Sequence, residues 1–180
     1  MVQLHKLLGH PKPLHILFYF FSHPSTQKTH TQLQKITSVS KATLTHWLHF
    51  LVQNRFLNQQ NIGRNKLYSL NKEFLFIKQL KIIYNLEQLQ FFIPYAQKQS
   101  LEIFLFGSAA RGENNEKSDI DILIIGNTTK EKIYQQLTSP IKNLKNPLRI
   151  QLFTPIEWSK ISQTDRAFYE RVEKDKILLQ

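Results

Sequence analysis

Residues 105–125 read LFGSAARGENNEKSDIDILII, and this stretch carries the most specific pattern in the chain. The apolar run that ends at Phe106 predicts a strand, and Gly107 lets the backbone approach a ligand closely. Ser108 falls at the start of a predicted helix, where free amides, the helix dipole and the hydroxyl favour phosphate. We therefore expect a phosphate-binding turn between a strand and a short helix.

Two aspartates, Asp119 and Asp121, begin the next predicted strand, 119–125. Successive side chains of a strand point to opposite faces, so both carboxylates project from one face while the isoleucines between and after them fill the other. Hard oxygen ligands of this kind suit Mg²⁺ or Mn²⁺, which keeps waters and substrate phosphates as its other ligands. The pair is therefore a candidate metal-binding and catalytic site.

The Gly-Ser pair, the ten residues 109–118 and the D-x-D pattern match the signature of the polymerase-beta-like nucleotidyltransferase superfamily. The added Arg111-Gly112 makes the chain look like the minimal nucleotidyltransferase branch. The resemblance covers about residues 85–160. It implies a mixed sheet flanked by helices, and it implies transfer of a nucleoside monophosphate, AMP from ATP, to a hydroxyl on RNA or protein.

The same resemblance assigns roles to the residues of the motif. Asp119 and Asp121 are the implied catalytic and metal-binding residues, and the bound ion would act with a second ion about 4 Å away. The residues implied to hold the nucleotide follow the signature: Gly107, Ser108, Arg111 and Ser118. Arg111 has an alternative interpretation as one half of a surface ion pair with Glu113 or Glu116.

Members of the superfamily usually carry a third carboxylate on a later strand, and the strand predicted at 148–153, LRIQLF, has no acidic residue. Gln151 is the best candidate for that position because it shares a face with Arg149, but glutamine cannot act as a base. Glu157 is explained by a predicted helix capping box. Glu102, at the start of a neighbouring strand, is a further substitute. A domain that binds a nucleotide with little or no turnover therefore remains an alternative.

The first part of the chain reads as three helices, at 14–21, at 31–36 and after Ser40, followed by strands at 56–59 and 67–70. This order resembles a winged helix-turn-helix domain over about residues 10–70. The resemblance implies that the third helix enters a major groove and that the wing touches the backbone. The implied nucleic-acid contacts are Lys41, Thr43, Thr45, His46, Arg64, Asn65 and Lys66.

Charge is unevenly distributed along the chain. Residues 1–80 hold ten Lys or Arg against the single acid Glu73, a net charge of +9, and the other 100 residues contribute +2 to the total of +11. Lys and Arg displace condensed counterions from phosphates, so the first half favours a polyanionic partner, DNA or RNA. The alternatives are a lysine-rich solvated surface and a small domain that only mediates protein contacts.

These patterns predict an α+β protein with three segments. Residues 1–72 form the winged helix-turn-helix domain, 73–98 a linking helix ended or kinked near Pro94, and 99–180 the nucleotidyltransferase domain. The chain has no cysteine for disulfides or thiolate metal sites. Its longest apolar stretch is far short of the roughly 20 residues that a membrane helix needs. With no export signal at the N-terminus, we expect a cytoplasmic protein without a membrane partner.

Two functional hypotheses follow from the sequence. The first is a metal-dependent enzyme that moves AMP to RNA or protein, guided by the basic domain. The second is a DNA-binding transcriptional regulator, or an antitoxin-like protein, whose nucleotidyltransferase domain is weakly active or inactive. Minimal nucleotidyltransferases often act beside HEPN-type toxins, so such a toxin and a second copy of the chain are candidate partners. A third hypothesis is an inert relative that only binds partners.

Overall fold

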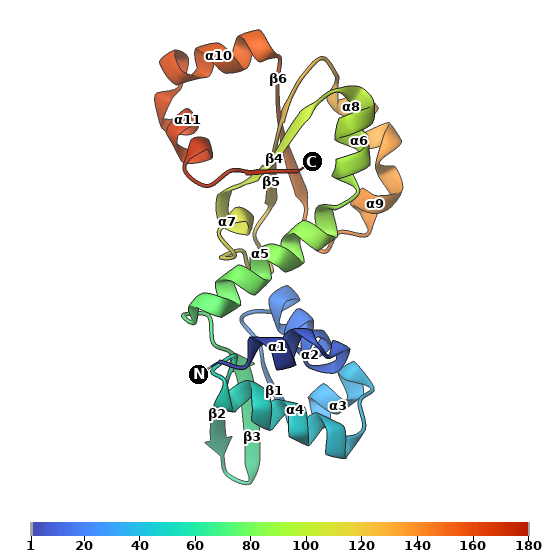
Figure 1. Ribbon diagram of the computed structural model, residues 1–180, viewed down its shortest axis with the longest axis vertical. Coiled ribbons are helices and arrows are strands. Elements are labelled where there is room, and N and C mark those ends of the chain that lie inside the picture. The colour runs from blue at the N-terminus through green and yellow to red at the C-terminus, as the bar shows by residue number, and fades with distance from the viewer. Residues whose placement is uncertain (1, 180) are drawn as a thin grey trace. The chain divides into compact units, whose positions relative to one another are not determined.

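The computed structural model describes residues 2–179, and its α+β chain divides after Lys78 into two units (Figure 1). The division falls inside helix α5 (Leu75–Leu89), which is followed by α6 (Phe92–Gln99). The predicted linking helix is thus two helices, with a break four residues before Pro94. Proline excludes the helical carbonyl of the fourth residue upstream, which explains the position of the break.

The first unit has the order of elements of a winged helix. Its elements are α1 (Leu4–Leu8), α2 (Pro11–Ser22), β1 (Gln27–Thr29), α3 (His30–Thr37), α4 (Lys41–Gln53), β2 (Leu57–Ile62) and β3 (Asn65–Leu70). The strands form an antiparallel sheet in the order β1-β3-β2. The β2–β3 hairpin is the wing, and Gly63 at its tip has a φ of +56°, a conformation that glycine adopts without strain.

The predicted helices and hairpin of this unit are confirmed. Ser40 caps α4 by accepting a hydrogen bond from the Thr43 amide, and the apolar side chains that recur at helical spacing along α4 are buried: Leu44, Trp47, Leu48 and Leu51. The wing turn is tighter than predicted, because Asn65 already belongs to β3 and pairs with Ile62. Strand β1 was not predicted, because its three polar residues show no periodicity from which a strand could be recognised.

The second unit contains one mixed sheet. Its elements after α6 are β4 (Glu102–Phe106), α7 (Gly107–Ala110), β5 (Ile120–Ile125), α8 (Lys130–Gln136), α9 (Thr138–Lys142), β6 (Leu148–Phe153), α10 (Pro155–Thr164), α11 (Arg166–Glu173) and β7 (Ile177–Leu178). The strand order is β6-β5-β4-β7, with β5 and β6 parallel and the other pairs antiparallel.

Helices cover both faces of this sheet. Figure 1 shows α6, α8 and α9 on one side and α10 and α11 on the other. The first side buries the isoleucines of β5 together with Phe92 and Ile133. The second side buries Phe104 and Leu123 against Val172 of α11. The predicted alternation of β5 is therefore confirmed, and its aspartate lies on the face that α11 covers in part.

The sequence of residues 166–178 predicts one final helix, but the helix observed there is shorter. Helix α11 ends at Glu173, and β7 pairs with β4 through Leu105 and Ile177. The amide of Leu179 also donates to the carbonyl of Ile103 at 2.8 Å. Residues 177–179 thus pair with the backbone groups at the open edge of β4. This tertiary pairing outweighs the helical pattern of the sequence.

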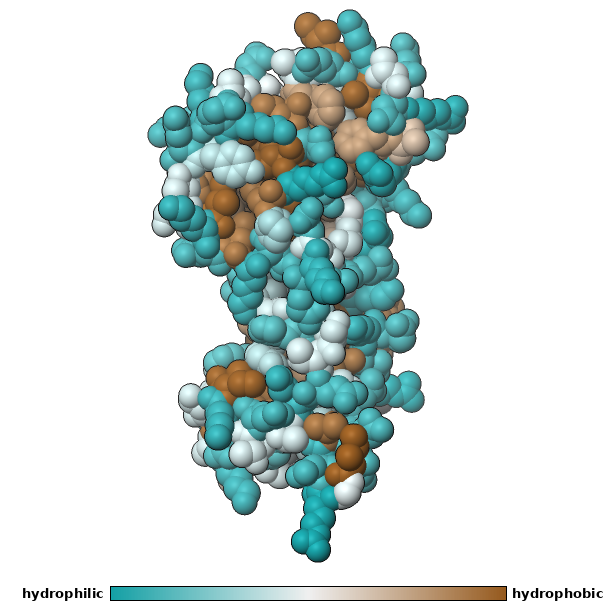
Figure 2. Space-filling model, turned by 180° about the vertical axis from the view of Figure 1, so that it is seen from behind, coloured by the Kyte–Doolittle hydropathy of each residue, from teal (hydrophilic) through white to brown (hydrophobic). Residues whose placement is uncertain are grey.

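Hydrophilic side chains cover most of the face shown in Figure 2, with a few brown areas where hydrophobic side chains reach the surface. The large hydrophobic residues that are more than half exposed are Leu8, Ile62, Leu75, Ile83 and Ile156. Among residues 2–179, no helix combines the length and the apolar character that crossing a bilayer requires.

Candidate functional site

A row of three residues crosses the sheet of the second unit on one face. Asp121 of β5 is paired with Phe106 of β4 on one side and with Arg149 of β6 on the other. Phe106 is the last residue before the Gly107-Ser108 turn, so the register brings that turn to the aspartate. The two halves of the sequence motif therefore meet at one place on the sheet.

Gly107 is required by its backbone and by its surroundings. Its φ is +73°, and a Cβ at this position would lie 2.7 Å from Oδ2 of Asp121. An L-residue would be strained here and would also displace the carboxylate. The atom closest to that Cβ belongs to Asp121, and the predicted close approach of a ligand to Gly107 stays a prediction.

Asp119 and Asp121 differ in their surroundings. Asp119 directly precedes β5 and is exposed, whereas Asp121 is half-buried. Burial raises the pKa of the Asp121 carboxyl, the positive charge of Arg149 lowers that pKa, and the negative charge of Asp119 raises it. The two aspartates thus lie close enough for one charge to act on the other. The predicted pair is brought together.

The two serines of the motif are used differently. Ser108 is half-buried, and its hydroxyl has no hydrogen-bond partner among the described residues, so it remains free for a ligand. The Ser118 hydroxyl accepts from the Asn115 amide at 2.9 Å, and its carbonyl accepts from Asn146 Nδ2 at 2.8 Å. Ser118 therefore holds the loop in place, and its contact with a nucleotide stays a prediction.

Arg111 is bound by two carboxylates. Its Nε donates to Glu113 at 2.9 Å and its Nη1 donates to Asp175 at 2.5 Å. These hydrogen bonds raise the pKa of the guanidinium, with that to Asp175 the larger cause. The alternative of an ion pair with Glu113 is confirmed, and the bond to Asp175 ties the turn to the segment after α11. Within residues 2–179, Oδ1 of Asp175 is buried without a partner.

Gln151, the residue predicted to stand in place of the third carboxylate, does not lie directly beside Asp121. Gln151 pairs with Leu123, and Arg149 is the residue beside Asp121. Arg149 and Gln151 share one face of β6, as predicted, and they alternate with Ile150, which is buried, and with Leu148 and Leu152, which pack against the core in part. Periodicity alone leaves the position along the strand open by two residues, and only the register with β5 decides it.

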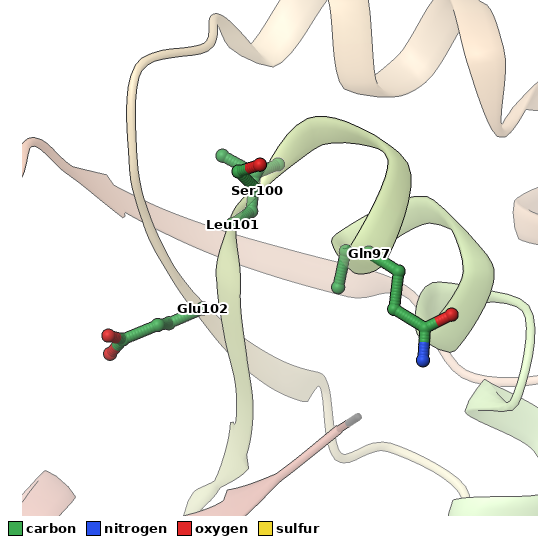
Figure 3. A pocket seen from close by; sticks show the side chains of 5 residues that line it. Gln97, Ser100, Leu101 and Glu102 are labelled. Carbon is green, nitrogen blue, oxygen red and sulfur yellow. The ribbon is translucent and has the colours of Figure 1, made fainter.

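The other two acids considered for this position lie elsewhere. Glu102 pairs with Ile125 at the far end of β4, four residues from Phe106 and thus about 13 Å away along the strand. There it lines a cavity of about 370 Å³ beside α6, and Figure 3 shows its side chain extending away from Gln97. Glu157 accepts from the amide and hydroxyl of Thr154, which confirms the predicted capping box. Neither carboxylate can serve Asp121.

The residues of the site fit one divalent ion at most. Asp119 and Asp121 supply the oxygen ligands that Mg²⁺ prefers. A second ion, however, would need a further acidic ligand where the permanent cation of Arg149 stands. Among the described residues, no group of three or more His, Cys, Asp or Glu side chains is placed to hold a metal. The site therefore does not fit the two-ion arrangement that the superfamily resemblance implies.

A buried polar cluster behind the turn was missed by the sequence analysis. Nδ2 of Asn85, on α5, donates to the carbonyl of Ala109 at 2.8 Å and to Oδ1 of Asn114 at 3.0 Å. Lys81, one turn earlier, donates to the carbonyl of Asn114. All three polar side chains are buried. Their hydrogen bonds hold α7 and the loop after it in place. In the sequence, this cluster is marked only by two polar residues in the apolar segment of α5 and by one asparagine in a polar loop.

The predicted nucleic-acid residues lie on α4 and the wing. Lys41, Thr45 and His46 are exposed on α4, and the three wing residues, at positions 64–66, are exposed as well. Thr43 is half-buried, and its hydroxyl accepts from Ser40 Oγ at 2.9 Å. The Thr45 hydroxyl donates to the Lys41 carbonyl at 2.9 Å and lies 3.0 Å from His30 Nε2. The two threonine hydroxyls are thus engaged within the protein.

The mixed sheet, the Gly-Ser turn and the aspartate pair define a domain of the polymerase-beta-like nucleotidyltransferase type. The family model described as a nucleotidyltransferase domain matches residues 86–178, and the chain belongs to that family. No match was found among curated proteins. A solved structure of reduced HlyU from Vibrio cholerae has 19% sequence identity, covers 37% of this chain and 67% of its own, and gives a TM-score of 0.33, too low to support an argument.

Proposed function

We propose that the second unit binds a nucleoside triphosphate, ATP, between the Gly107-Ser108 turn and the Asp119–Asp121 pair, with little or no turnover. The observation that supports this proposal is the packing of Gly107 on Asp121, with 2.7 Å between a Cβ built at Gly107 and the carboxylate Oδ2. That contact joins both halves of the motif, and the free Ser108 hydroxyl adds a donor for phosphate. The first unit then makes the chain a nucleic-acid-binding regulator.

Weak turnover follows from the residue beside Asp121. Nucleotidyl transfer requires an acceptor hydroxyl to attack the alpha-phosphorus, lose its proton and expel pyrophosphate. A carboxylate in the position of Arg149 could take the proton, whereas arginine stays protonated in proteins. If a Mg²⁺ ion binds to Asp119 and Asp121, it neutralises phosphate charge. The protein's own side chains still supply no base at that point.

The second candidate function is active transfer of AMP to a hydroxyl on RNA or protein. It is favoured by the assembly of the glycine, the serine and both aspartates at one place on the sheet. A HEPN-type toxin encoded beside this chain would be a natural acceptor or partner. In this case the basic first unit would position the target.

Two measurements on the full chain separate the candidates. Equilibrium binding of ATP in Mg²⁺ should be seen with the wild type and be weaker in the Asp119→Ala, Asp121→Ala double variant, which lacks the proposed metal ligands. Incubation with alpha-labelled ATP, Mg²⁺ and pooled RNA or protein acceptors should give no more labelled product for the wild type than for that variant. Labelled product from the wild type alone would establish the enzyme, and absence of ATP binding would refute both candidates.

We further propose that α4 and the wing bind nucleic acid. Lys41, Arg64 and Lys66 are exposed, and the first unit carries a net charge of +9. His46 is exposed on α4, where it can reach base edges, while the wing cations reach phosphates. Selection from random duplexes should recover a preferred site. His46→Ala should relax the preference, and Lys66→Ala should weaken all sequences alike.

A further inference from the structure

Arg149 has an unusual position for a surface arginine. It is exposed on β6, directly beside Asp121 in the parallel register. Within residues 2–179 its guanidinium forms no ion pair within 4 Å and no hydrogen bond, not even with Asp121. Its five donors are therefore available to a ligand that enters the face between the turn and the aspartates.

A second arginine reaches the same face from α11. The guanidinium of Arg171 lies 5.3 Å from the centre of the Phe168 ring. Phe168 in turn packs on Phe106 and Phe153, with ring centres 6.1 and 6.0 Å apart, so it fixes α11 on the face that carries Asp121. Like Arg149, Arg171 has no carboxylate partner among the described residues.

The charges of these arginines are felt at the aspartate. Arg149, Arg171 and Arg111 each lower the pKa of the Asp121 carboxyl, Arg149 most of the three, although burial raises it overall. Arg111 is already bound by Glu113 and Asp175. Two guanidinium groups without a carboxylate partner within residues 2–179, from β6 and α11, therefore flank the place where the motif would hold phosphates.

We propose that Arg149, assisted by Arg171, binds the triphosphate chain directly, in the place where an acidic residue and a second metal ion would otherwise stand. This inference rests on the nucleotide binding proposed above and specifies how it is achieved. A guanidinium presents parallel N–H donors that match two phosphate oxygens and keeps its charge at every physiological pH. The site is thereby made for a nucleoside triphosphate whose binding does not require a divalent cation.

The experiment measures the affinity of the full chain for ATP by calorimetry, in Mg²⁺ and again in EDTA. Inorganic triphosphate serves as a second probe, for the phosphate chain without base and ribose. The variants are Arg149→Gln, which removes the charge, and Arg149→Asp, which places a carboxylate beside Asp121. Lys142→Gln is the matched control, since Lys142 is exposed on α9 of the same unit. Circular dichroism checks that each variant is folded.

We expect the effect of replacing Arg149 on ATP affinity to depend on whether Mg²⁺ is present. The wild type and Lys142→Gln should bind ATP in EDTA within about tenfold of their affinity in Mg²⁺, and Arg149→Gln should lose at least about tenfold in EDTA. Arg149→Asp should bind ATP only in Mg²⁺. Inorganic triphosphate should follow ATP in every case.

Three results would overturn the proposal. Wild-type binding that vanishes in EDTA would show that the arginines do not replace an ion, while leaving the proposed nucleotide binding intact. Arg149→Gln that binds in EDTA as the wild type does would show that Arg149 is a solvated surface residue. No binding of ATP or triphosphate under either condition would remove this inference and the proposed function together.

Discussion

The negative charge of Asp121 lowers the stability of the folded protein when no ligand is bound. Its carboxyl is half-buried, and burial raises its pKa in the folded state above the ordinary value. The folded protein then binds this proton more tightly than the unfolded chain. Stability therefore falls as pH rises from the unfolded pKa of about 3.9 through the folded one, and the full cost is present at neutral pH.

We accordingly expect Asp121→Asn to raise the Tm at pH 7 relative to the wild type. The difference should disappear near pH 3, where the Asp121 carboxyl of the wild type is protonated in the folded and in the unfolded state. Thermal unfolding followed by circular dichroism at both pH values measures this. Asp119→Asn is the control, because Asp119 is exposed and its replacement should move the Tm by less than about 2 °C. A lower Tm for Asp121→Asn at pH 7 would show that the nearby arginines outweigh burial.

Gly107 gives a second prediction at this scale. Gly107→Ala combines a positive φ with the approach of a Cβ to 2.7 Å from Asp121 Oδ2, and should cost about 2 to 3 kcal/mol in urea unfolding. In an Asp121→Ala background only the backbone strain remains, about 1 to 2 kcal/mol. A coupling free energy of about 1 kcal/mol should appear between the two positions. If the destabilisation by Gly107→Ala were the same in both backgrounds, the Asp121 carboxylate would move away from the added methyl group at no cost.

The sequence predicted the aspartates and the glycine because each is marked by residue type and short-range spacing. Arg149 was not predicted as their neighbour, because the register between β5 and β6 is a long-range property. Asp175 was missed for the same reason, since 64 residues separate it from Arg111. Local pattern therefore recovers the motif, and only the tertiary structure shows that Arg149 lies beside Asp121.

At the scale of elements, α5 supports the site through a polar contact rather than an apolar one. Asn85 is buried and links α5 to α7 and to Asn114 in the loop that leads to β5. A buried amide of this kind stabilises only while all its partners remain. The position of the Gly107-Ser108 turn thus depends on one asparagine of the helix.

We expect Asn85→Ala to destabilise the protein by about 2 kcal/mol, because the Ala109 carbonyl and the Asn114 side chain lose a buried donor. Urea unfolding provides the measurement, provided that the dependence of the free energy of unfolding on urea concentration is the same for the wild type and the variant. Glu87→Ala is the control on the exposed side of the same helix and should change the free energy of unfolding by less than about 0.5 kcal/mol. Equal effects of both substitutions would show that the contacts of Asn85 contribute nothing.

The elements that sequence analysis recovered are the long periodic ones. Helices α2, α3 and α4 and strand β6 lie where their apolar spacing placed them. Those it missed are α1, β1, α9 and β7, each of five residues or fewer. Such segments are too short to show a period, and β1 and β7 exist because an open strand edge accepts them.

At the scale of the whole molecule, the two units differ strongly in net charge. The division after Lys78 leaves ten basic residues and one acid in the first unit, and fourteen basic and twelve acidic residues in the second. Association with a polyanion depends on the number of phosphates neutralised. The salt dependence of nucleic-acid binding should therefore arise almost entirely from the first unit.

This argument yields a quantitative prediction for the full chain. Replacing Lys41, Arg64 and Lys66 by alanine should reduce the slope of log K against log salt for duplex DNA by about 2.7, since each lost phosphate contact removes about 0.9. The control removes the same charge from exposed lysines of the second unit: Lys130, Lys132 and Lys142. Fluorescence anisotropy over a range of salt concentrations measures both. A slope unchanged by the first triple variant would place the nucleic acid elsewhere, and a slope reduced equally by both would indicate that the protein binds through its net charge alone.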